Sequence, residues 1–459
     1  MVALHTVPAS SAALDPSLGD DDLVIALADD ASLTRSGVDA LVELAAECDA
    51  DAWYGDIDVA GVVTLRPGWS PTRLIAEPTA STPLAVRVGW LRRHQISPGQ
   101  PDLALRLARH GAEVAHITAV MSRHRSTPPG PAQTDIKAHI SEIGLRATLD
   151  DSGRLHPAGD FDASVTIVVP TAGAALADGS VAIARLLERL EPMPDRFDVV
   201  IVVGDEFRGD AHKLEGTGRT IVRSPHGSFN FARAVNTGVL AARSDLVLLL
   251  NDDTEPSDFR FIDRMALHLD DETVAGVGAL LTYPNATVQH AGIVIDDARP
   301  LHPFVGWDPA ATAVHGGLTA RDVAAVTGGC MMVRRSDYLA VGGLSTVFPL
   351  SFNDVDLCVR LRRSVGRIIM EPAATLVHHE TLSREPVISA EEWDRWIDRW
   401  GEIVDPWYHP GYRRPDDPHA LARNADHLPP ESGASPVASH RLPRLRSQVH
   451  RGRPTSRQL

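Results

Sequence analysis

Two short acidic clusters contain the side chains that could do chemistry. The first, Asn251-Asp-Asp253, directly follows the apolar run Leu246–Leu250. The second lies in Phe352-Asn-Asp354-Val-Asp356, which opens a run with the Leu, Val and Arg spacing of a helix. Open α/β sheets bind ligands at the carboxyl ends of their strands. We therefore expect a metal and phosphate site at the first cluster, facing a general base in the second.

The elements that must position these clusters alternate between strand-like and helix-like runs from Phe161 to about Trp407. Val165–Pro170 and Phe197–Val203 are almost continuously apolar, which is typical of strands buried on both faces. Val181–Leu190 and the segment Phe231–Leu240 have the apolar spacing of helices. This βαβαβ order predicts an α/β fold with a mostly parallel sheet and helices on both faces.

Composition and charge limit the classes of protein. The chain has 459 residues, 44% of them hydrophobic, so two or three folded units with sizeable cores are expected. The net charge of -16 argues against nucleic acid as the main partner, because phosphate backbones are bound by basic surfaces. The three cysteines, Cys48, Cys330 and Cys358, form no CxxC pair, which fits a reducing cytoplasm.

The termini bear on the expected location. The first residues show no basic stretch followed by an apolar one, and no apolar run approaches the roughly 20 residues that span a bilayer. We expect a cytoplasmic protein, with peripheral contact on the cytoplasmic face of the inner membrane as an alternative. That alternative rests on the aperiodic, arginine-rich tail from about Tyr412, which is predicted to be disordered. A tail that is merely solvated is the simpler interpretation.

An internal repeat organises the chain. Asp102-Leu-Ala-Leu-Arg106 matches Asp356-Leu-Cys-Val-Arg360, and His124 follows Arg106 at the same separation as His378 follows Arg360. Likewise, Ile25-Ala-Leu-Ala-Asp29-Asp30 matches Leu248-Leu-Leu-Asn251-Asp252-Asp253. Three matches in the same order favour a duplication over chance.

The first copy is expected to be truncated and inactive. It begins too late to contain either of the two strands equivalent to Val165–Pro170 and Phe197–Val203, and it has Gln100 where the second copy has Asp354. We predict a half domain at 1–125, a linker at 126–160, a catalytic domain at 161–411 and a disordered basic tail at 412–459. An incomplete sheet must cover its edge and face, so this copy should pack on the second domain or on another chain in a homo-oligomer.

Together these motifs resemble the family-2 glycosyltransferases, which have the GT-A fold, over roughly Ser164 to Arg384. The segments that carry the resemblance are Val165–Thr171, Ser228–Gly238, Asn251–Asp253, Val288–Val294, Val326–Arg335, Asn353–Asp356 and His378–Arg384. The subgroup makes bacterial surface polysaccharides and often has two such domains in tandem. Trp53–Asp58 and Pro67–Pro71 are similar to the first domain of those tandem proteins.

The resemblance implies a metal-dependent, inverting enzyme. Its donor is a nucleotide-diphosphate sugar carrying a hexosyl or deoxyhexosyl group, and its acceptor is a hydroxyl of a glycan or lipid-linked glycan. Mn²⁺ or Mg²⁺ would be held by Asp253 and His378 and would stabilise the departing diphosphate. Asp354 is the candidate general base, since inversion needs a carboxylate opposite the leaving group. The residues expected to contact the nucleotide or donor are Thr171, Asp205, Asn236 and Asp252.

Other interpretations of these residues remain. Asp252 and Asp253 could form only a polar turn, and His378 could be a hydrogen-bonded histidine, because His124 persists in the copy that seems inactive. Asp356 could pair with Arg360 one helical turn later. Three tryptophans at helical spacing are expected to pack in the core: Trp393, Trp396 and Trp400.

Competing functions differ in what they require. A nicotinamide dehydrogenase would need G-x-G-x-x-G after its first strand, and a P-loop NTPase would need GxxxxGK[ST]; neither motif is present. The main alternative is a non-catalytic sugar- or partner-binding protein of a polysaccharide assembly complex. Donor hydrolysis in Mn²⁺ would distinguish an enzyme from such a protein.

Overall fold

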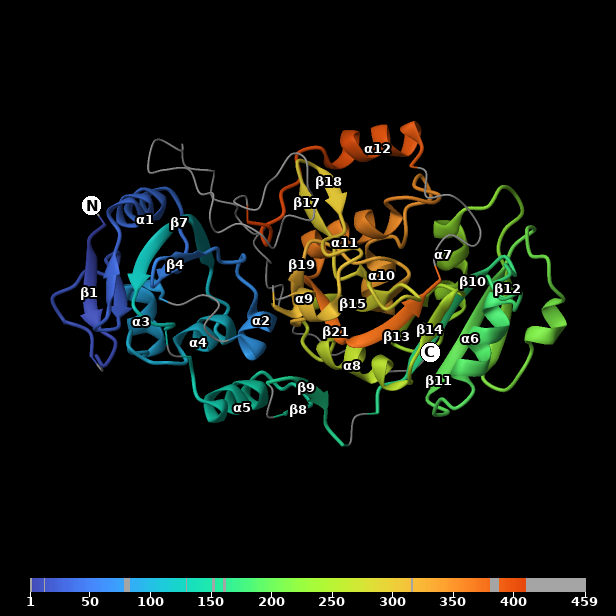
Figure 1. Cartoon of the computed structure of the whole chain (residues 1–459), viewed down its shortest axis with the longest axis horizontal. Coiled ribbons are helices and arrows are strands. Elements are labelled where there is room, and N and C mark those ends of the chain that lie inside the picture. Colours follow the sequence, from blue (N-terminus) through green and yellow to red (C-terminus); the bar gives the residue numbers. More distant parts are fainter. Residues whose placement is uncertain are drawn as a thin grey trace, which may run out of the picture.

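The computed structural model describes residues 2–11, 13–77, 83–128, 130–150, 153–159, 162–314, 317–379 and 388–409 (Figure 1). The expected disordered tail and Arg384 lie outside these residues. Within them, every helix is too short or too polar to cross a bilayer.

The C-terminal domain is built on a ten-stranded sheet. Its strands are β10 (Val165–Thr171), β11 (Phe197–Val203), β12 (Arg219–Arg223), β13 (Leu246–Leu250), β14 (Thr254–Pro256), β15 (Val274–Thr282), β16 (Val288–His290), β19 (Arg321–Val323), β20 (Cys330–Arg334) and β21 (Arg367–His378). The main path is β12-β11-β10-β13-β20-β15-β21-β14. Of the first seven strands on this path, six point the same way and β20 runs against them. The expected mixed, mostly parallel sheet is confirmed.

Helices cover both faces of this sheet. The helices of the domain are α6 (Ala182–Leu190), α7 (Phe231–Ala241), α8 (Arg260–His268), α9 (Pro309–Val314), α10 (Arg335–Ala340), α11 (Asn353–Ser364) and α12 (Ala390–Trp400), with a 3-10 turn at η1 (Ala211–Leu214). Successive strand residues point to opposite faces. Ile167 therefore shares a core with Leu186 of α6 and Met265 of α8. Val168 shares the opposite core with Val235 of α7. A small hairpin, β17 (Val294–Asp296) and β18 (Arg299–Leu301), completes the domain.

The N-terminal region forms a second, smaller sheet, at the blue end of Figure 1. Its strands are β1 (Leu4–Pro8), β2 (Leu23–Leu27), β3 (Ala31–Leu33), β4 (Ala52–Val59), β5 (Val62–Thr64), β6 (Ala85–Arg87) and β7 (Val114–His124). Its helices are α1 (Arg35–Glu47), α2 (Pro71–Ala76), α3 (Val88–His94) and α4 (Leu103–Arg109). The path is β1-β2-β6-β4-β7-β3, and β5 pairs with β4.

This smaller sheet repeats the order of the larger one. β6 is antiparallel to β2 and β4, and β4 is parallel to β7, as β20, β13, β15 and β21 are related in the larger sheet. At the edge, Ala31 pairs with His124, just as Thr254 pairs with His378. The residues matched by the sequence repeat therefore lie at equivalent positions in the two sheets.

One expectation about the smaller sheet is wrong. β1 is parallel to β2, as β10 is parallel to β13, so one of the two strands thought to be missing has a counterpart. In the described part of the chain, no strand continues the sheet beyond β1 to match β11 or β12. β1 escaped notice because Leu-His-Thr-Val-Pro is a short, partly exposed edge strand and not an apolar run.

The segment expected to be a linker is folded. It contains α5 (Gln133–Glu142) and a hairpin of β8 (Ala147–Leu149) and β9 (Leu155–Pro157), which run below the two sheets in Figure 1. Ile136 and Ile140 of α5 are buried. The hairpin is tied to the C-terminal domain by Arg146, whose Nε and Nη2 each lie 2.9 Å from the carboxylate of Asp270.

The N-terminal sheet packs on the C-terminal domain, as expected for an incomplete sheet. Arg367 Nη1 donates to Thr72 Oγ1 at 2.9 Å. Thr319 Oγ1 donates to Glu77 at 2.6 Å. Ser70 bonds to the buried carboxylate of Asp322. The contacts join α2 to β19 and β21.

Candidate active site

The turn Asn251–Asp253 lies at the carboxyl end of β13. The backbone N–H of Asn251 donates to the carbonyl of Gly329 at 3.0 Å, and Thr254 Oγ1 donates to the carbonyl of Asn251 at 2.7 Å. The chain then enters β14, whose Thr254 is paired with His378 of β21. This pairing brings His378 beside Asp253, far from it in sequence.

His378 is oriented by a residue on the other side of its ring. Gln289 Oε1 lies 2.7 Å from His378 Nδ1, and because an amide oxygen can only accept, Nδ1 carries the donated proton. In the neutral ring, Nε2 then presents a lone pair, and it lies 3.0 Å from Asp253 Oδ1. Two electron-rich atoms at this distance require a proton or a cation between them.

The residues around His378 Nε2 fit a divalent cation. Asn251 Oδ1 and Asp253 Oδ1 are buried and form no hydrogen bond within the described residues. Buried oxygens without partners are costly, and carboxylate and amide oxygens are the ligands that Mg²⁺ and Mn²⁺ prefer. His378 would add one imidazole nitrogen. Asp253 and His378 are the side chains that would hold the ion. Gln289 orients the histidine, as outer partners of metal-binding histidines commonly do.

Asp252 and Thr171 meet where β13 and β10 end. Thr171 Oγ1 donates to Asp252 Oδ2 at 2.5 Å and accepts from the N–H of Gly173 at 3.0 Å. Burial raises the pKa of Asp252 to about 6; the Thr171 hydrogen bond opposes this rise and the charge of Asp253 adds to it. The structure therefore brings two of the expected donor-binding residues together, beside the cation site.

Asp354 stands in the first turn of α11, across a glycine loop from the acidic turn. Its Oδ2 accepts from the N–H of Gly328 at 2.9 Å, and its Oδ1 accepts from the N–H of Val355 at 2.8 Å. The next loop residue, Gly329, accepts from Asn251. One loop thus contacts both acidic clusters. The two backbone bonds hold the Asp354 carboxylate in one orientation at a helix N-terminus, which favours negative charge.

The backbone that leads into Asp354 is strained. Phe352 has a φ of 61°, a left-handed conformation that costs a non-glycine residue roughly 1–2 kcal/mol. Its ring is stacked on Trp396 at a centroid distance of 5.2 Å and contacts Trp393 at 5.8 Å. This aromatic cluster holds the strained residue in place. Backbone strain of this kind is concentrated at functional sites.

Asp356 has a structural role, as its sequence context suggested. It is fully buried, and its Oδ2 accepts from Arg360 at 2.6 and 2.8 Å. Its Oδ1 accepts from Arg399 at 3.0 Å and from Trp400 Nε1 at 2.9 Å. This network fastens α12 to α11. Trp396 and Trp400 are buried, so core packing of these tryptophans is confirmed.

The two other residues expected to bind the donor, Asp205 and Asn236, form hydrogen bonds with nearby groups of the chain. Asp205, half exposed after β11, accepts from the N–H of Gly227 and lies 2.7 Å from His226 Nδ1; these two bonds lower its pKa. Asn236 needs a correction. Its Oδ1 accepts from Tyr338 at 2.5 Å and from the N–H of Leu344 at 2.9 Å, so it supports the turn after α10 and is not available to orient a nucleotide.

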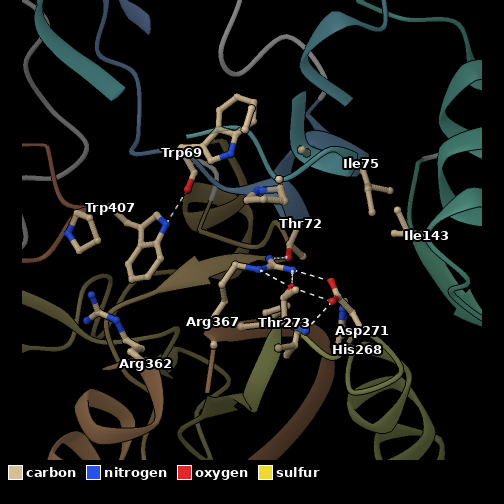
Figure 2. Close-up of a pocket in the computed structure, with 18 of the residues that line it drawn as sticks. Trp69, Thr72, Ile75, Ile143, His268, Asp271, Thr273, Arg362, Arg367 and Trp407 are labelled. Atoms are coloured by element: carbon tan, nitrogen blue, oxygen red, sulfur yellow. Dashed lines mark hydrogen bonds and ion pairs between the residues drawn. The ribbon is translucent and has the colours of Figure 1, made fainter. Parts of the chain in front are cut away.

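A large cavity lies away from these residues. It has a volume of about 750 Å³ and is lined by residues of both the N-terminal and the C-terminal regions (Figure 2). Residues labelled at its wall include Trp69, Thr72, Ile75, Ile143, Arg362 and Trp407. Arg367, also in the wall, begins β21, whereas His378 ends it, so the cavity and the acidic turn are at opposite ends of one strand. Asp271 and Asp322, each 2.7 Å from Arg367, neutralise its charge. The cavity therefore contains none of the residues predicted to act on the donor or acceptor.

Sequence reasoning missed Gln289. It lies within the segment Val288–Val294 that was matched to the family, but a pattern in one strand does not reveal which distant ring an amide contacts. The same holds for His226, the partner of Asp205. Gly328 lies within the matched segment Val326–Arg335, and its N–H is one of the two that hold the Asp354 carboxylate.

Comparisons with known proteins relate the C-terminal domain to glycosyltransferases. Residues 166–341 match the model of Glycosyl transferase family 2. The chain is 26% identical over 431 residues to the uncharacterized protein y4gI of Sinorhizobium fredii, covering 83% of this chain and 45% of that one. It is 26% identical over 406 residues to the O-antigen biosynthesis protein RfbC of Myxococcus xanthus, covering 78% of this chain and 31% of that one. The chain thus spans less than half the length of either relative.

Among solved structures, the mannosyltransferase PcManGT of Pyrobaculum calidifontis, in complex with GDP-Man and Mn²⁺, is similar with 18% identity and a TM-score of 0.35. The similarity covers 48% of this chain and 58% of that one. The family match covers the strands and turns that carry Thr171, Asp252 and Asp253. Residues 166–341 therefore match a family-2 glycosyltransferase domain, and this part of the chain has the mixed, mostly parallel sheet expected for a GT-A-type fold.

Proposed function

We propose that the C-terminal domain transfers a sugar from a nucleotide-diphosphate sugar to a hydroxyl of a glycan or lipid-linked glycan. The observation that carries this proposal is the arrangement at the ends of β13, β21 and α11. Asp253 and His378 face each other over 3.0 Å, and the loop that bonds to Asp354 also bonds to Asn251. One loop, Gly328–Gly329, therefore connects the proposed site of the cation that binds the diphosphate with the fixed carboxylate of Asp354.

The residues of the chain would divide the reaction between them. Asp252 and Thr171 lie beside the cation site and would contact the nucleotide or its ribose. Asp354, held by two backbone N–H groups, would take the proton of the acceptor hydroxyl as it attacks the anomeric carbon. Attack opposite the leaving group would invert that carbon. A divalent cation held by Asp253 and His378 would neutralise charge on the departing diphosphate.

The biological setting is also a proposal. One relative is named an O-antigen biosynthesis protein, which supports a role in the synthesis of a cell-surface polysaccharide. We propose that the enzyme works in the cytoplasm. The transferred group would be a hexosyl or deoxyhexosyl unit. The acceptor would be presented at the cytoplasmic face of the membrane.

A panel of nucleotide sugars tests this function. Each would first be screened for its effect on the thermal unfolding of the full chain in Mn²⁺, since a bound ligand stabilises the folded state by mass action. Donors that bind would then be assayed for release of the nucleoside diphosphate, in Mn²⁺ and in EDTA. We expect slow, Mn²⁺-dependent hydrolysis of at least one donor. Binding without hydrolysis or transfer to any acceptor would instead support a non-catalytic sugar-binding protein.

A further inference from the structure

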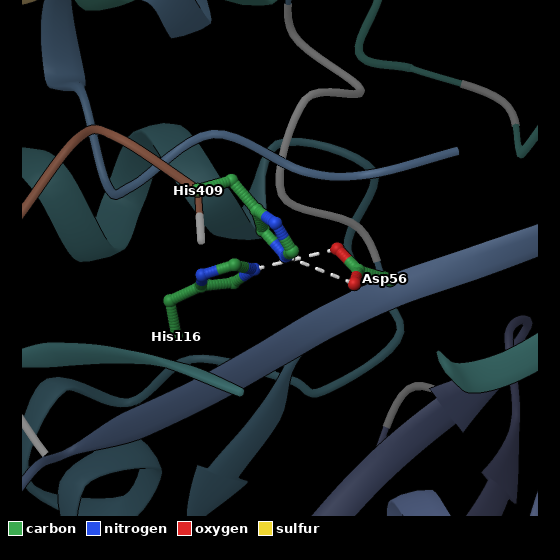
Figure 3. Close-up of side chains that lie close together, drawn as sticks. All are labelled: Asp56, His116 and His409. Atoms are coloured by element: carbon green, nitrogen blue, oxygen red, sulfur yellow. Dashed lines mark hydrogen bonds and ion pairs between the residues drawn. The ribbon is translucent and has the colours of Figure 1, made fainter. Parts of the chain in front are cut away.

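A second cluster of metal-ligand side chains lies outside the glycosyltransferase site. It joins Asp56 of β4 and His116 of β7 to His409, which follows α12 in the sequence (Figure 3). His409 Nε2 lies 3.0 Å from Asp56 Oδ2, and His116 Nε2 lies 3.6 Å from Asp56 Oδ1. The potential ligand atoms of these three side chains all lie within 4.8 Å of one another. Among the described residues, this is the one group of three or more His, Cys, Asp or Glu side chains placed closely enough to bind one metal ion.

The strands explain why these side chains share one face. Tyr54 of β4 is paired with His116 of β7, and Asp56, two residues later, points to the same side as Tyr54. The Tyr54 and His116 rings pack at a centroid distance of 4.8 Å. Asp56 is almost completely buried, and its Oδ1 accepts from the N–H of Arg66 at 2.7 Å. The sheet thus directs a buried carboxylate and a histidine toward the incoming His409.

We propose that Asp56, His116 and His409 bind a first-row transition-metal cation of the Zn²⁺ class. Two imidazoles and one carboxylate suit such ions better than they suit Mg²⁺ or Ca²⁺, which prefer oxygen ligands. In a four-coordinate zinc site, bonds of about 2.0–2.1 Å place neighbouring ligand atoms about 3.3 Å apart. The separations of 3.0 and 3.6 Å lie on either side of that value.

An independent observation points to a ligand. His116 Nε2 is buried and makes no hydrogen bond in the described residues, although it faces the carboxylate of Asp56. Leaving a buried polar atom without a partner costs roughly 1–3 kcal/mol. A cation among the three side chains would satisfy that atom.

The metal would fasten the two regions of the chain together. Residues 405–409 cross from one region to the other. Asp405 accepts from the N–H of Ile295 in the C-terminal domain at 3.0 Å. Trp407 Nε1 donates to the carbonyl of Trp69 in the N-terminal region at 2.9 Å. A metal bound by His409 together with Asp56 of β4 and His116 of β7 would attach the end of this segment to the N-terminal sheet. This role does not depend on sugar transfer.

Metal binding by the full-length chain tests the proposal. The Asp253→Ala variant is used because it lacks the proposed Mn²⁺ or Mg²⁺ ligand of the other site. After treatment with EDTA and dialysis, this protein would be titrated with ZnCl₂ by calorimetry. We expect one Zn²⁺ per chain and a higher thermal unfolding midpoint when Zn²⁺ is present. Adding His116→Gln or His409→Gln should weaken binding at least about 100-fold, because even outer partners of metal ligands contribute 10–100-fold.

His156→Gln is the matched control, since His156 also lies 2.7 Å from an aspartate but has no second histidine there. It should bind Zn²⁺ like its parent. If the Asp253→Ala protein binds no Zn²⁺, or if the His116 and His409 variants bind it as tightly as the control, the proposal is wrong. Should those variants fail to fold, Co²⁺ added to the Asp253→Ala protein decides: intense visible bands of a four-coordinate site support the proposal, and their absence overturns it.

Discussion

His124 and His378 occupy the same register position in two sheets of one chain, yet their surroundings differ. His378 is oriented by Gln289 and faces Asp253 at 3.0 Å. His124 Nε2 is instead paired with Ser122 Oγ at 2.8 Å. Asp30, at the position of Asp253, accepts from Ser126 Oγ at 2.8 Å. The N-terminal sheet thus has the same backbone arrangement as the site, but its histidine and aspartate each form a hydrogen bond with a serine.

The comparison shows what a site needs beyond a fold. Each sheet has a strand, an acidic turn and a histidine in register. In the C-terminal sheet that histidine, His378, faces the carboxylate of the acidic turn, whereas in the N-terminal sheet His124 and Asp30 each bond to a serine. β5, which pairs with β4 as β16 pairs with β15, is Val62-Val-Thr64 and carries no amide to orient His124. We infer that the N-terminal sheet binds no donor and serves as a packing partner.

The largest expected effect comes from Asp354, in the first turn of α11, in comparison with Gln100, which precedes α4. Asp354→Asn should lower transfer about 10²–10⁴-fold while donor binding is kept, because the amide cannot take the acceptor proton. Gln100→Ala, at the matching place in the N-terminal sheet, should leave the rate unchanged. Steady-state kinetics and calorimetry with the same donor would measure both. Near-normal transfer by Asp354→Asn would remove the general base from this account.

The next comparison concerns the aspartate–arginine pair that both regions contain. Asp356 is fully buried with Arg360, Arg399 and Trp400 as partners, so Asp356→Ala should cost about 3–5 kcal/mol of unfolding free energy. Asp102 pairs with Arg106 at 2.8 Å nearer the surface, and Asp102→Ala should cost less than about 1 kcal/mol. Urea unfolding of the two variants would show the difference. Equal losses would contradict the assigned burial of the two pairs.

A smaller effect is expected from the residue that orients His378. Gln289→Leu should weaken Mn²⁺ binding about 10–100-fold, because His378 Nδ1 would lose the acceptor that fixes its proton. Ser122→Ala removes the partner of His124 and should leave Mn²⁺ affinity unchanged. Calorimetric titration of Mn²⁺ in the presence of a nucleoside diphosphate compares the two. An unchanged affinity in Gln289→Leu would argue against His378 as a ligand.

The smallest expected effect is on the pH dependence of stability, and it comes from the buried histidine His139. Burial, with a smaller contribution from the charge of Arg109, lowers the pKa of His139 on α5 to about 4. In the unfolded chain its pKa is about 6.5, so between these values the unfolded state binds more protons and stability falls as the pH falls. From pH 7 to 5 this should cost about 1–2 kcal/mol.

His139→Gln should lack that loss, and His156→Gln, at a partly buried histidine paired with Asp150, should retain it. Thermal unfolding midpoints measured at pH 7, 6 and 5 would compare the variants with the parent chain. A wild-type midpoint that declines with acid as much as that of His139→Gln would show that His139 does not remain neutral in the fold.

Much of the architecture was predictable because buried parallel strands are continuous apolar runs. β10, β11 and β13, and the helical spacing of α6, α7 and α11, all appear where the runs predicted them. The Asp356–Arg360 pair was predictable because residues one turn apart are neighbours on a helix. The repeat was visible because ungapped matches survive in strands and helices more readily than in loops.

The rest depends on contacts between distant segments. The sequence did not indicate that Gln289 orients His378, or that Tyr338 and Leu344 donate hydrogen bonds to Asn236. The periodicity of a strand or helix does not reveal contacts between such distant residues. β1 was missed because an edge strand needs no continuous apolar run. The folding of α5 and its hairpin between the two regions was hidden by the polar joins on either side.

The claim that one chain has a single donor site, at Asp253 and His378, is tested most directly by calorimetry with UDP and with GDP in Mn²⁺. The wild-type chain should bind one nucleotide, and EDTA should weaken that binding. Asp253→Ala should bind more weakly and become nearly indifferent to EDTA, whereas Asp30→Ala should match the wild type. Two sites per chain, equal losses in both variants, or wild-type binding that EDTA does not change would contradict the account.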